Sequence, residues 1–261
     1  MNALAARRRH PAAIALLLLV GLLLVGAAYS LFSPKQAQAA PATADEVSQG
    51  RDLFLANCAT CHGLNGEGTA SGPTLVGVGA AAVDFQVSTG RMPLAGPNVQ
   101  APQVQDVRFT EEQIAALSAY VASLAPGPPI PDSEYTEGEN ADIARGGELF
   151  RINCAMCHNF AGSGGALTRG KYAPHIGTAE GKYIYEAMVT GPQSMPVFND
   201  TNISPEGKND IIAYLKAIQD QQNYGGMNLG NLGPVSEGMF IWVFGLALMI
   251  ACAWWLGQKA A

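Results

Sequence analysis

The sequence predicts an all-α protein with two similar helical domains in tandem, an N-terminal hydrophobic segment and a C-terminal transmembrane helix. Three observations support this prediction. A stretch of 14 residues occurs twice, as GRDLFLANCATCHG from Gly50 and as GGELFRINCAMCHN from Gly146. Each copy is followed by a segment whose apolar residues recur at helical spacing. Two long uncharged runs lie near the ends of the chain.

Both repeats contain a Cys-x-x-Cys-His pentad, formed by Cys58, Cys61 and His62 in the first copy and by Cys154, Cys157 and His158 in the second. In such a pentad the two thiols add across the vinyl groups of a haem, and the histidine ligates the iron. The sequence therefore predicts two covalently bound haem c groups.

The same four cysteines allow two other interpretations, a zinc site and a redox-active dithiol. Cys-x-x-Cys pairs do bind zinc, but a zinc site leaves both following histidines unexplained. A thioredoxin-like dithiol is expected after a strand, whereas the segments before these pentads have a helical pattern.

The sixth iron ligand decides whether a haem carries electrons or binds substrates. Met92 follows His62 by 30 residues and Met195 follows His158 by 37, and each methionine precedes a proline that stiffens its loop. We therefore predict His62 and Met92 as the ligands of the first iron, and His158 and Met195 as those of the second. His175 is the alternative in the second domain, although threonine occupies the matching position of the first.

We expect the first domain at residues 45–125, a proline-rich linker at 126–140 and the second domain at 141–222. The first domain should open with a helix from Asp45 to Asn57, in which Gly50 and Phe54 share a face. Thr110 and Gln113 form a capping box before a closing helix. The apolar face of that helix comprises Ile114, Leu117, Val121 and Leu124.

The second domain repeats this plan. Its first helix is expected from Ala141 to Asn153, with Gly146 and Phe150 in register. Ser204 should cap the closing helix, with Pro205 in its first turn. The buried face of that helix comprises Ile211, Tyr214, Leu215 and Ile218.

The segment 1–36 contains a run of 20 uncharged residues, Ala12 to Leu31, after Arg7, Arg8 and Arg9. It is long enough to span a bilayer, but Ala37-Gln38-Ala39 also resembles the cleavage site of a signal peptide. Either interpretation predicts that the rest of the chain is exported.

The run 239–256 has 18 uncharged residues with tryptophans near both ends, which predicts a transmembrane helix with a cytoplasmic C-terminus. The connector before it, from Asn223 to Pro234, is rich in glycine and asparagine. All 21 acidic residues lie between Asp45 and Glu237, with only ten of the fifteen basic ones, which argues against a nucleic-acid partner.

With these motifs, the chain resembles the dihaem cytochrome c subunit of the actinobacterial cytochrome bc complex, a menaquinol–cytochrome c reductase. The resemblance covers nearly the whole chain. It implies two class I cytochrome c domains, and carbonyl groups of Pro73 and Pro174 that orient the proximal histidines. Asn159 departs from the glycine that often follows the pentad.

The resemblance also implies a role and partners. The chain would take electrons from a Rieske iron–sulfur subunit, beside a cytochrome b subunit, and pass them to the dicopper centre of a haem-copper oxidase. The haem domains would lie on the outer face of the cell membrane, with no catalytic site of their own. Two alternatives remain at this point: the cytochrome subunit of a periplasmic dehydrogenase, and a dihaem peroxidase.

Overall fold

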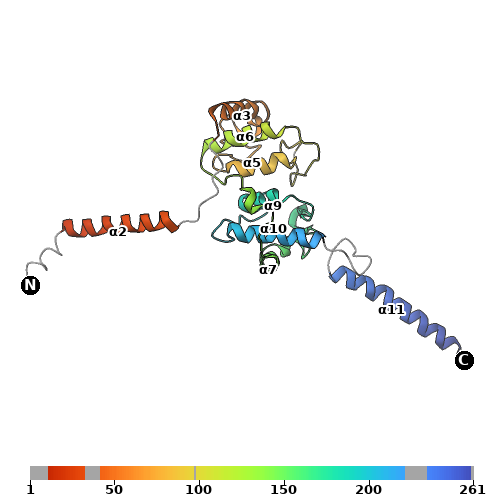
Figure 1. Ribbon diagram of the computed structural model, residues 1–261. Helices are drawn as coiled ribbons and strands as arrows, with labels where there is room; N and C mark the ends of the chain where they lie inside the picture. The colour runs from red at the N-terminus through yellow and green to blue at the C-terminus, as the bar shows by residue number, and fades with distance from the viewer. Residues whose placement is uncertain (1–10, 33–41, 97, 221–233, 260–261) are drawn as a thin grey trace, which may run out of the picture. The chain divides into compact units, whose positions relative to one another are not determined.

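The computed structural model describes residues 11–32, 42–96, 98–220 and 234–259, and these residues are helical apart from loops and one two-stranded sheet (Figure 1). The chain divides into two units, residues 1–38 and 39–261, and the second unit contains both repeats. The predicted all-α class is confirmed.

The first domain is built from two crossing helices and two shorter ones. They are α3 (Ala44–Asn57), α4 (Ala59–His62), α5 (Gly79–Ser88) and α6 (Glu111–Leu124). The predicted capping box is present, because the backbone N–H of Gln113 donates to the Thr110 hydroxyl and the backbone N–H of Thr110 donates to Oε1 of Gln113. The core comprises Phe54, Leu117, Tyr120 and Val121.

The second domain repeats this arrangement and adds a small sheet. Its elements are η1 (Ser133–Tyr135), α7 (Ile143–Asn153), α8 (Ala155–His158), β1 (Gly165–Ala166), η2 (Thr168–Gly170), β2 (Tyr172–Ala173), α9 (Gly181–Thr190) and α10 (Pro205–Asp220). β1 and β2 pair antiparallel, with Gly165 opposite Ala173. Helix α7 begins two residues later than we predicted, because the Asp142 side chain caps it by accepting from the N–H groups of Ala144 and Arg145, each at 3.0 Å.

In both domains the first and last helices cross at a glycine. A Cβ added to Gly50 would lie 1.9 Å from the Ala116 carbonyl oxygen, and one added to Gly146 would lie 1.9 Å from the Asp210 carbonyl oxygen. One turn further along, Phe54 packs against Tyr120 with ring centroids 5.2 Å apart. Phe150 and Tyr214 form the matching pair at 5.5 Å. The glycine–phenylalanine register predicted from the sequence is therefore confirmed.

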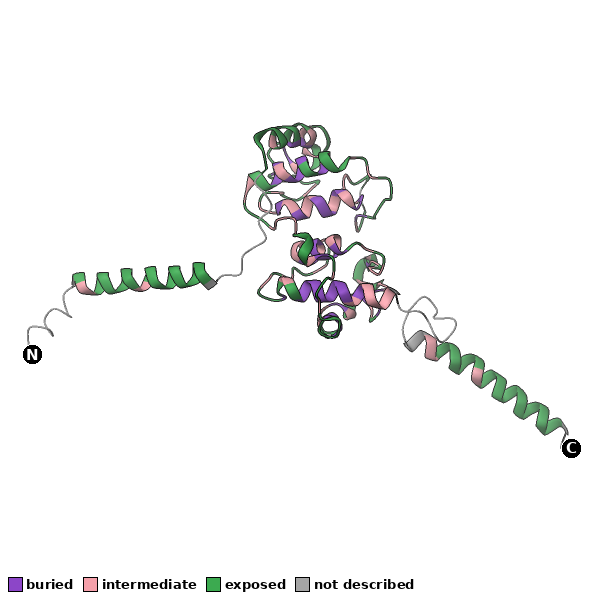
Figure 2. Ribbon diagram, in the orientation of Figure 1, coloured by how far each residue is buried: buried purple, intermediate pink, exposed green. Residues whose placement is uncertain are grey.

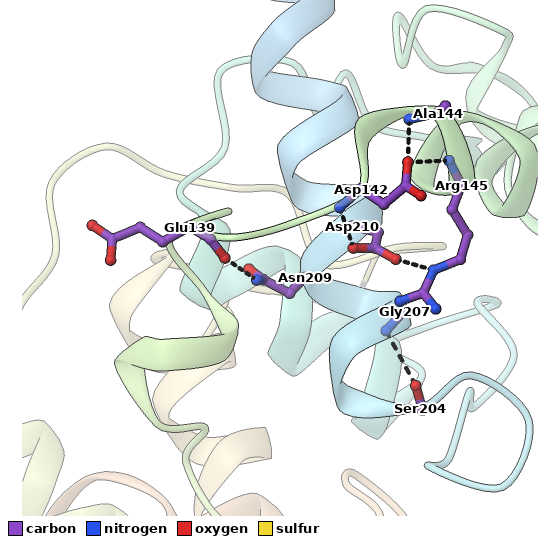
Figure 3. A network of polar contacts seen from close by, with 8 residues as sticks. All are labelled: Glu139, Asp142, Ala144, Arg145, Ser204, Gly207, Asn209 and Asp210. Carbon is purple, nitrogen blue, oxygen red and sulfur yellow. Dashed lines mark hydrogen bonds and ion pairs between the residues drawn. The ribbon is translucent and has the colours of Figure 1, made fainter.

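A polar network reinforces the crossing of α7 and α10 in the second domain (Figure 3). The buried Asp210 carboxylate accepts from the Asp142 N–H at 2.8 Å and pairs with the Arg145 guanidinium. The neighbouring Asn209 side chain donates to the Glu139 carbonyl at 2.9 Å. At the start of α10, the Gly207 N–H donates to the Ser204 hydroxyl, as expected for a capping residue.

The segment 126–140 is packed against helices of both domains. The Ala81 N–H donates to the Pro128 carbonyl at 3.1 Å, and the Gly138 N–H donates to the Asn209 side chain at 2.8 Å. Thr136 is buried. These contacts hold both ends of the segment that its proline-rich composition predicts as a linker.

Two further helices, α2 (Pro11–Phe32) and α11 (Pro234–Lys259), are long and apolar enough to cross a membrane. Their candidate spans are Ala12–Leu31 and Glu237–Gln258, and their side chains are almost all exposed (Figure 2). A signal sequence near the N-terminus has the same properties as a membrane anchor, so both interpretations of α2 stand. Arg7 to Arg9, the cleavage-like Ala37 to Ala39 and most of the connector from Asn223 lie outside the described residues.

Candidate haem sites

Each pentad occupies the junction between a long helix and a single following turn. Cys58 ends α3 by donating its N–H to the Phe54 carbonyl at 2.8 Å, and the His62 N–H donates to the Cys58 carbonyl at 3.0 Å. In the second domain, the Cys154 N–H and the His158 N–H make the matching bonds at 2.8 and 2.9 Å. The two thiols and the imidazole of each copy therefore lie within about one helical turn.

The imidazole ring of each pentad is oriented by a proline carbonyl. Nδ1 of His62 lies 2.8 Å from the Pro73 oxygen, and Nδ1 of His158 lies 3.1 Å from the Pro174 oxygen. A carbonyl can only accept, so Nδ1 must donate, and in the neutral ring Nε2 keeps its lone pair. This confirms the predicted role of both prolines and leaves Nε2 of each pentad histidine available to a metal.

Burial sets the protonation of the second site. It lowers the pKa of His158, which favours the neutral imidazole that can ligate a metal. Burial, together with the nearby Cys157, raises the pKa of Cys154 to about 12, and burial also raises the pKa of Cys58. A reactive dithiol requires a lowered thiol pKa, so these environments disfavour the dithiol interpretation.

The placement of the cysteines disfavours a single zinc site. Among the described residues, no group of three or more His, Cys, Asp or Glu side chains is found in an arrangement that could hold a metal ion. The two cysteine pairs instead belong to separate domains, Cys58 beside the core of the first and Cys154 within the core of the second.

Glycines let the loop after each pentad fold back tightly. The Gly68 N–H donates to the His62 carbonyl at 2.7 Å, and the Gly164 N–H donates to the His158 carbonyl at 2.9 Å. Both glycines have positive φ angles, and a Cβ on Gly164 would lie 2.4 Å from the Ala173 carbonyl oxygen. This fold brings the proline segment to the imidazole. The residues present therefore fit a haem held through two thiols and a histidine.

The two predicted methionine ligands have different surroundings. Met195 is partly buried and packs against the core cluster that contains Cys154, and its N–H donates to the Pro192 carbonyl at 3.0 Å. Met92 is also partly buried, and its N–H donates to the Gln86 carbonyl at 2.9 Å. Met92 is not among the described residues packed around Cys58 and the first core. Within the described residues, the structure brings a pentad thiol and a predicted methionine ligand into one cluster in the second domain and not in the first.

The main chain of His175 lies next to the segment that orients His158. This residue directly follows Pro174, whose carbonyl faces His158, and its backbone nitrogen would be 2.9 Å from a Cβ on Gly164. The His175 main chain therefore lies beside the pentad histidine, whereas Met195 packs against the core that contains Cys154.

Contacts between the domains were missed by the sequence reasoning. The Gln100 side chain donates to the Tyr172 carbonyl at 2.9 Å and accepts from the Tyr172 N–H at 3.0 Å. Lys182 on α9 pairs with Asp84 on α5, with Nζ and Oδ2 2.5 Å apart. No local sequence pattern predicts such pairs, because the two partners are far apart in the chain.

The helical fold and the paired pentads with their oriented histidines define a protein with two cytochrome c domains. Residues 47–125 match the family described as cytochrome c, and residues 141–215 match the family described as cytochrome c oxidase, cbb3-type, subunit III. Two such domains imply haem c binding.

The relatives that cover nearly the whole chain are more specific, and several, among them the following three, are named "Cytochrome bc1 complex cytochrome c subunit". The one from Corynebacterium diphtheriae is 44% identical over 270 residues, covering 97% of this chain and 95% of the relative. The Mycobacterium leprae protein is 44% identical over 256 residues, covering 94% and 87%. The Mycobacterium tuberculosis protein is 44% identical over 255 residues, covering 94% and 90%.

This chain belongs to the family of cytochrome bc1 complex cytochrome c subunits. Its role is electron transfer, and the family together with the two apolar helices indicates association with a membrane.

Proposed function

We propose that this chain is a membrane-tethered dihaem electron relay that takes electrons from a Rieske iron–sulfur subunit after menaquinol oxidation and delivers them to a haem-copper oxidase. The observation that carries the proposal is the repetition of one histidine geometry, Nδ1 to a proline carbonyl, in both domains of a chain related throughout to bc1 complex subunits.

The proposed cofactors are two covalent haem c groups. Cys58 and Cys61 attach the first and Cys154 and Cys157 the second. His62 and Met92 ligate the first iron, and His158 and Met195 the second. A haem ligated by histidine and methionine supplies a one-electron couple with a raised potential and no open iron position.

The chain's own residues hold this couple in place. The proline carbonyls fix the tautomer and orientation of each imidazole. The helix crossings at Gly50 and Gly146 fix the pentads against the cores. A filled sixth position disfavours the peroxidase alternative, because peroxide needs an open iron site.

The proposed location follows from α11. This helix holds the haem domains at the outer face of the cell membrane and leaves Lys259 at the cytoplasmic side, in accord with the positive-inside tendency. Tethering raises the effective concentration of neighbouring redox partners, so that no soluble carrier is needed. The proposed partners are the Rieske subunit, the cytochrome b subunit and the oxidase, in one stable assembly.

The test is quinol-driven oxygen uptake by the complex purified in detergent through a tag on this chain. We expect the Rieske, cytochrome b and oxidase subunits to copurify and turnover to proceed without added soluble cytochrome c. Turnover that starts only after a soluble cytochrome is supplied would contradict the relay. Copurification of a dehydrogenase in place of the Rieske and cytochrome b subunits would establish the dehydrogenase alternative.

A further inference from the structure

The two cytochrome c domains meet through helices α5 and α9. An ion pair spans this contact: the Lys182 ammonium of the second domain lies 2.5 Å from the Asp84 carboxylate of the first. The Asp84 side chain is only 7% exposed, so the negative charge of the pair lies inside the contact. The nearby Tyr183 side chain reaches Ser88 of α5.

A second carboxyl is buried at the same place. Glu186 lies one helical turn after Lys182 on α9 and has no exposed surface. Within the described residues, neither of its side-chain oxygens has a partner in regular hydrogen-bond geometry, and the nearest polar group is the Asp84 carboxylate, which could accept a hydrogen bond only from a protonated Glu186. Asp84 is close enough to repel its charge. An ionised carboxylate in this position would be desolvated, unpaired and beside another negative charge, which is a costly arrangement.

Among the residues that the structure describes, the charged groups around Glu186 do not supply a second cation. From α5 it faces Asp84, and on its own helix it faces Lys182, which Asp84 already engages. On the α10 side, Lys208 pairs with Asp200 and faces the ring of Tyr185. Burial, reinforced by Asp84, raises the pKa of Glu186 to about 10, so the carboxyl is protonated at neutral pH.

We propose that Glu186 is a proton-binding site at the interface of the two cytochrome c domains, so that docking of the domains takes up one proton from the surrounding solution. When the domains separate, Glu186 meets water and ionises as an ordinary carboxyl. When they dock, its carboxylate gains a proton and enters the interface as a neutral acid. Acidification of the compartment that holds the domains therefore stabilises the docked arrangement. This inference does not depend on which electron donor or acceptor the chain serves.

The docking equilibrium can be followed on the full chain by pulsed electron paramagnetic resonance. Gln49 of α3 and Glu148 of α7 are exposed, and one lies in each domain. Each is replaced by a genetically encoded non-canonical amino acid to which a spin label is attached. The haems are kept reduced and diamagnetic. Between pH 5 and pH 10 we expect the ratio of separated to docked molecules to rise by up to about tenfold per pH unit, as the release of one proton requires.

Matched variants isolate the carboxyl. Glu186→Gln keeps the size of the side chain, cannot ionise, and should abolish the pH dependence. Glu180→Gln, at an exposed carboxyl just before α9, should leave it unchanged. Lys182→Met removes the ion pair with Asp84 and so weakens docking. In this variant the separated molecules should become numerous enough to detect at a lower pH than in the wild type. If Lys182→Met shows no separated population up to pH 10, or if Glu186→Gln keeps the wild-type pH dependence, the proposal is wrong.

An infrared measurement tests the bound proton directly. At pH 7 the wild type should show the C=O stretch of a buried protonated carboxylic acid, and Glu186→Gln should lack it. Asp84→Asn releases Lys182 to pair with Glu186, so this variant should lose the band as well. Absence of the band from the wild type at pH 7 would overturn the proposal, even if Glu186→Gln failed to fold.

Discussion

The backbone of Gly146 lies against the carbonyl group of Asp210, leaving no room for a side chain where α7 crosses α10. Gly50 and Ala116 have the same relationship in the first domain. Because each pentad directly follows the helix that carries the glycine, the closeness of the crossing determines how the cysteines and the histidine meet the core.

Replacing either glycine should therefore destabilise one domain. Gly146→Ala gains about 1 kcal/mol of helix propensity but forces the helices apart at a cost of about 3 kcal/mol, a net loss of about 2 kcal/mol. Thermal unfolding of the full chain, followed by circular dichroism and by the second haem's absorbance, should show that domain melting roughly 10 °C lower. Gly96→Ala, where a Cβ meets nothing within 4 Å, is the control. Equal melting of the two variants would show that the crossing can relax.

Methionine ligation can be tested in each domain separately. The oxidised protein should show the weak charge-transfer band of methionine bound to ferric haem, and Met92→His or Met195→His should each remove about half of it. Retention of the full band in both single variants would exclude the assigned ligands.

Haem attachment in one domain should not depend on the other. Cys154→Ala leaves one thiol in the second pentad, so we expect a single thioether there or loss of that haem. The first domain should still mature, because it has its own core around Phe54 and its own oriented histidine. The mass of the purified chain and its pyridine haemochrome spectrum count the attached haems. Loss of both haems from a chain that accumulates normally would show that the domains mature together.

The stability of the protein should fall as pH rises, because of Glu186. A carboxyl whose pKa is raised from 4.5 to about 10 binds its proton more tightly in the folded protein than in the unfolded chain. The free energy of unfolding should therefore decrease by up to about 1.4 kcal/mol per pH unit within this window. Urea unfolding at pH 6 and pH 8 should show that Glu186→Gln lacks this component, whereas Glu180→Gln retains it. The same pH slope in wild type and Glu186→Gln would contradict the assignment.

The sequence predicted those parts of the fold that depend on local patterns. Thr110 and Gln113 mark the start of α6 because a capping box acts over three residues. Gly50 and Phe54 share a face because the helix repeats every 3.6 residues. The two histidine–proline contacts were reached through the family resemblance, since nothing in the spacing of 11 or 16 residues indicates them.

The contacts between the domains could not be predicted in this way. Asp84, Lys182 and Glu186 each belong to a short helix, where a charged residue normally indicates a solvated face. The burial of Lys208 could not be predicted from the sequence either. This lysine in the first turns of α10 is fully buried against Asp200 and the Ile203 carbonyl. Burial of such groups depends on partners that the linear sequence does not bring together.

The two hydrogen bonds between Gln100 and Tyr172 determine which substitutions at these two positions preserve the contact between the domains. The Gln100 side chain bonds to the backbone N–H and C=O groups of Tyr172, so the contact involves the main chain of residue 172 and not its side chain. Every residue except proline offers both groups, so the identity of residue 172 is free to change while the contact persists. Position 100 has no such freedom, since a glutamate there would present only acceptors to a carbonyl oxygen. A chimaera that exchanges the second domain for that of a relative should therefore keep this contact whenever it keeps a glutamine at position 100.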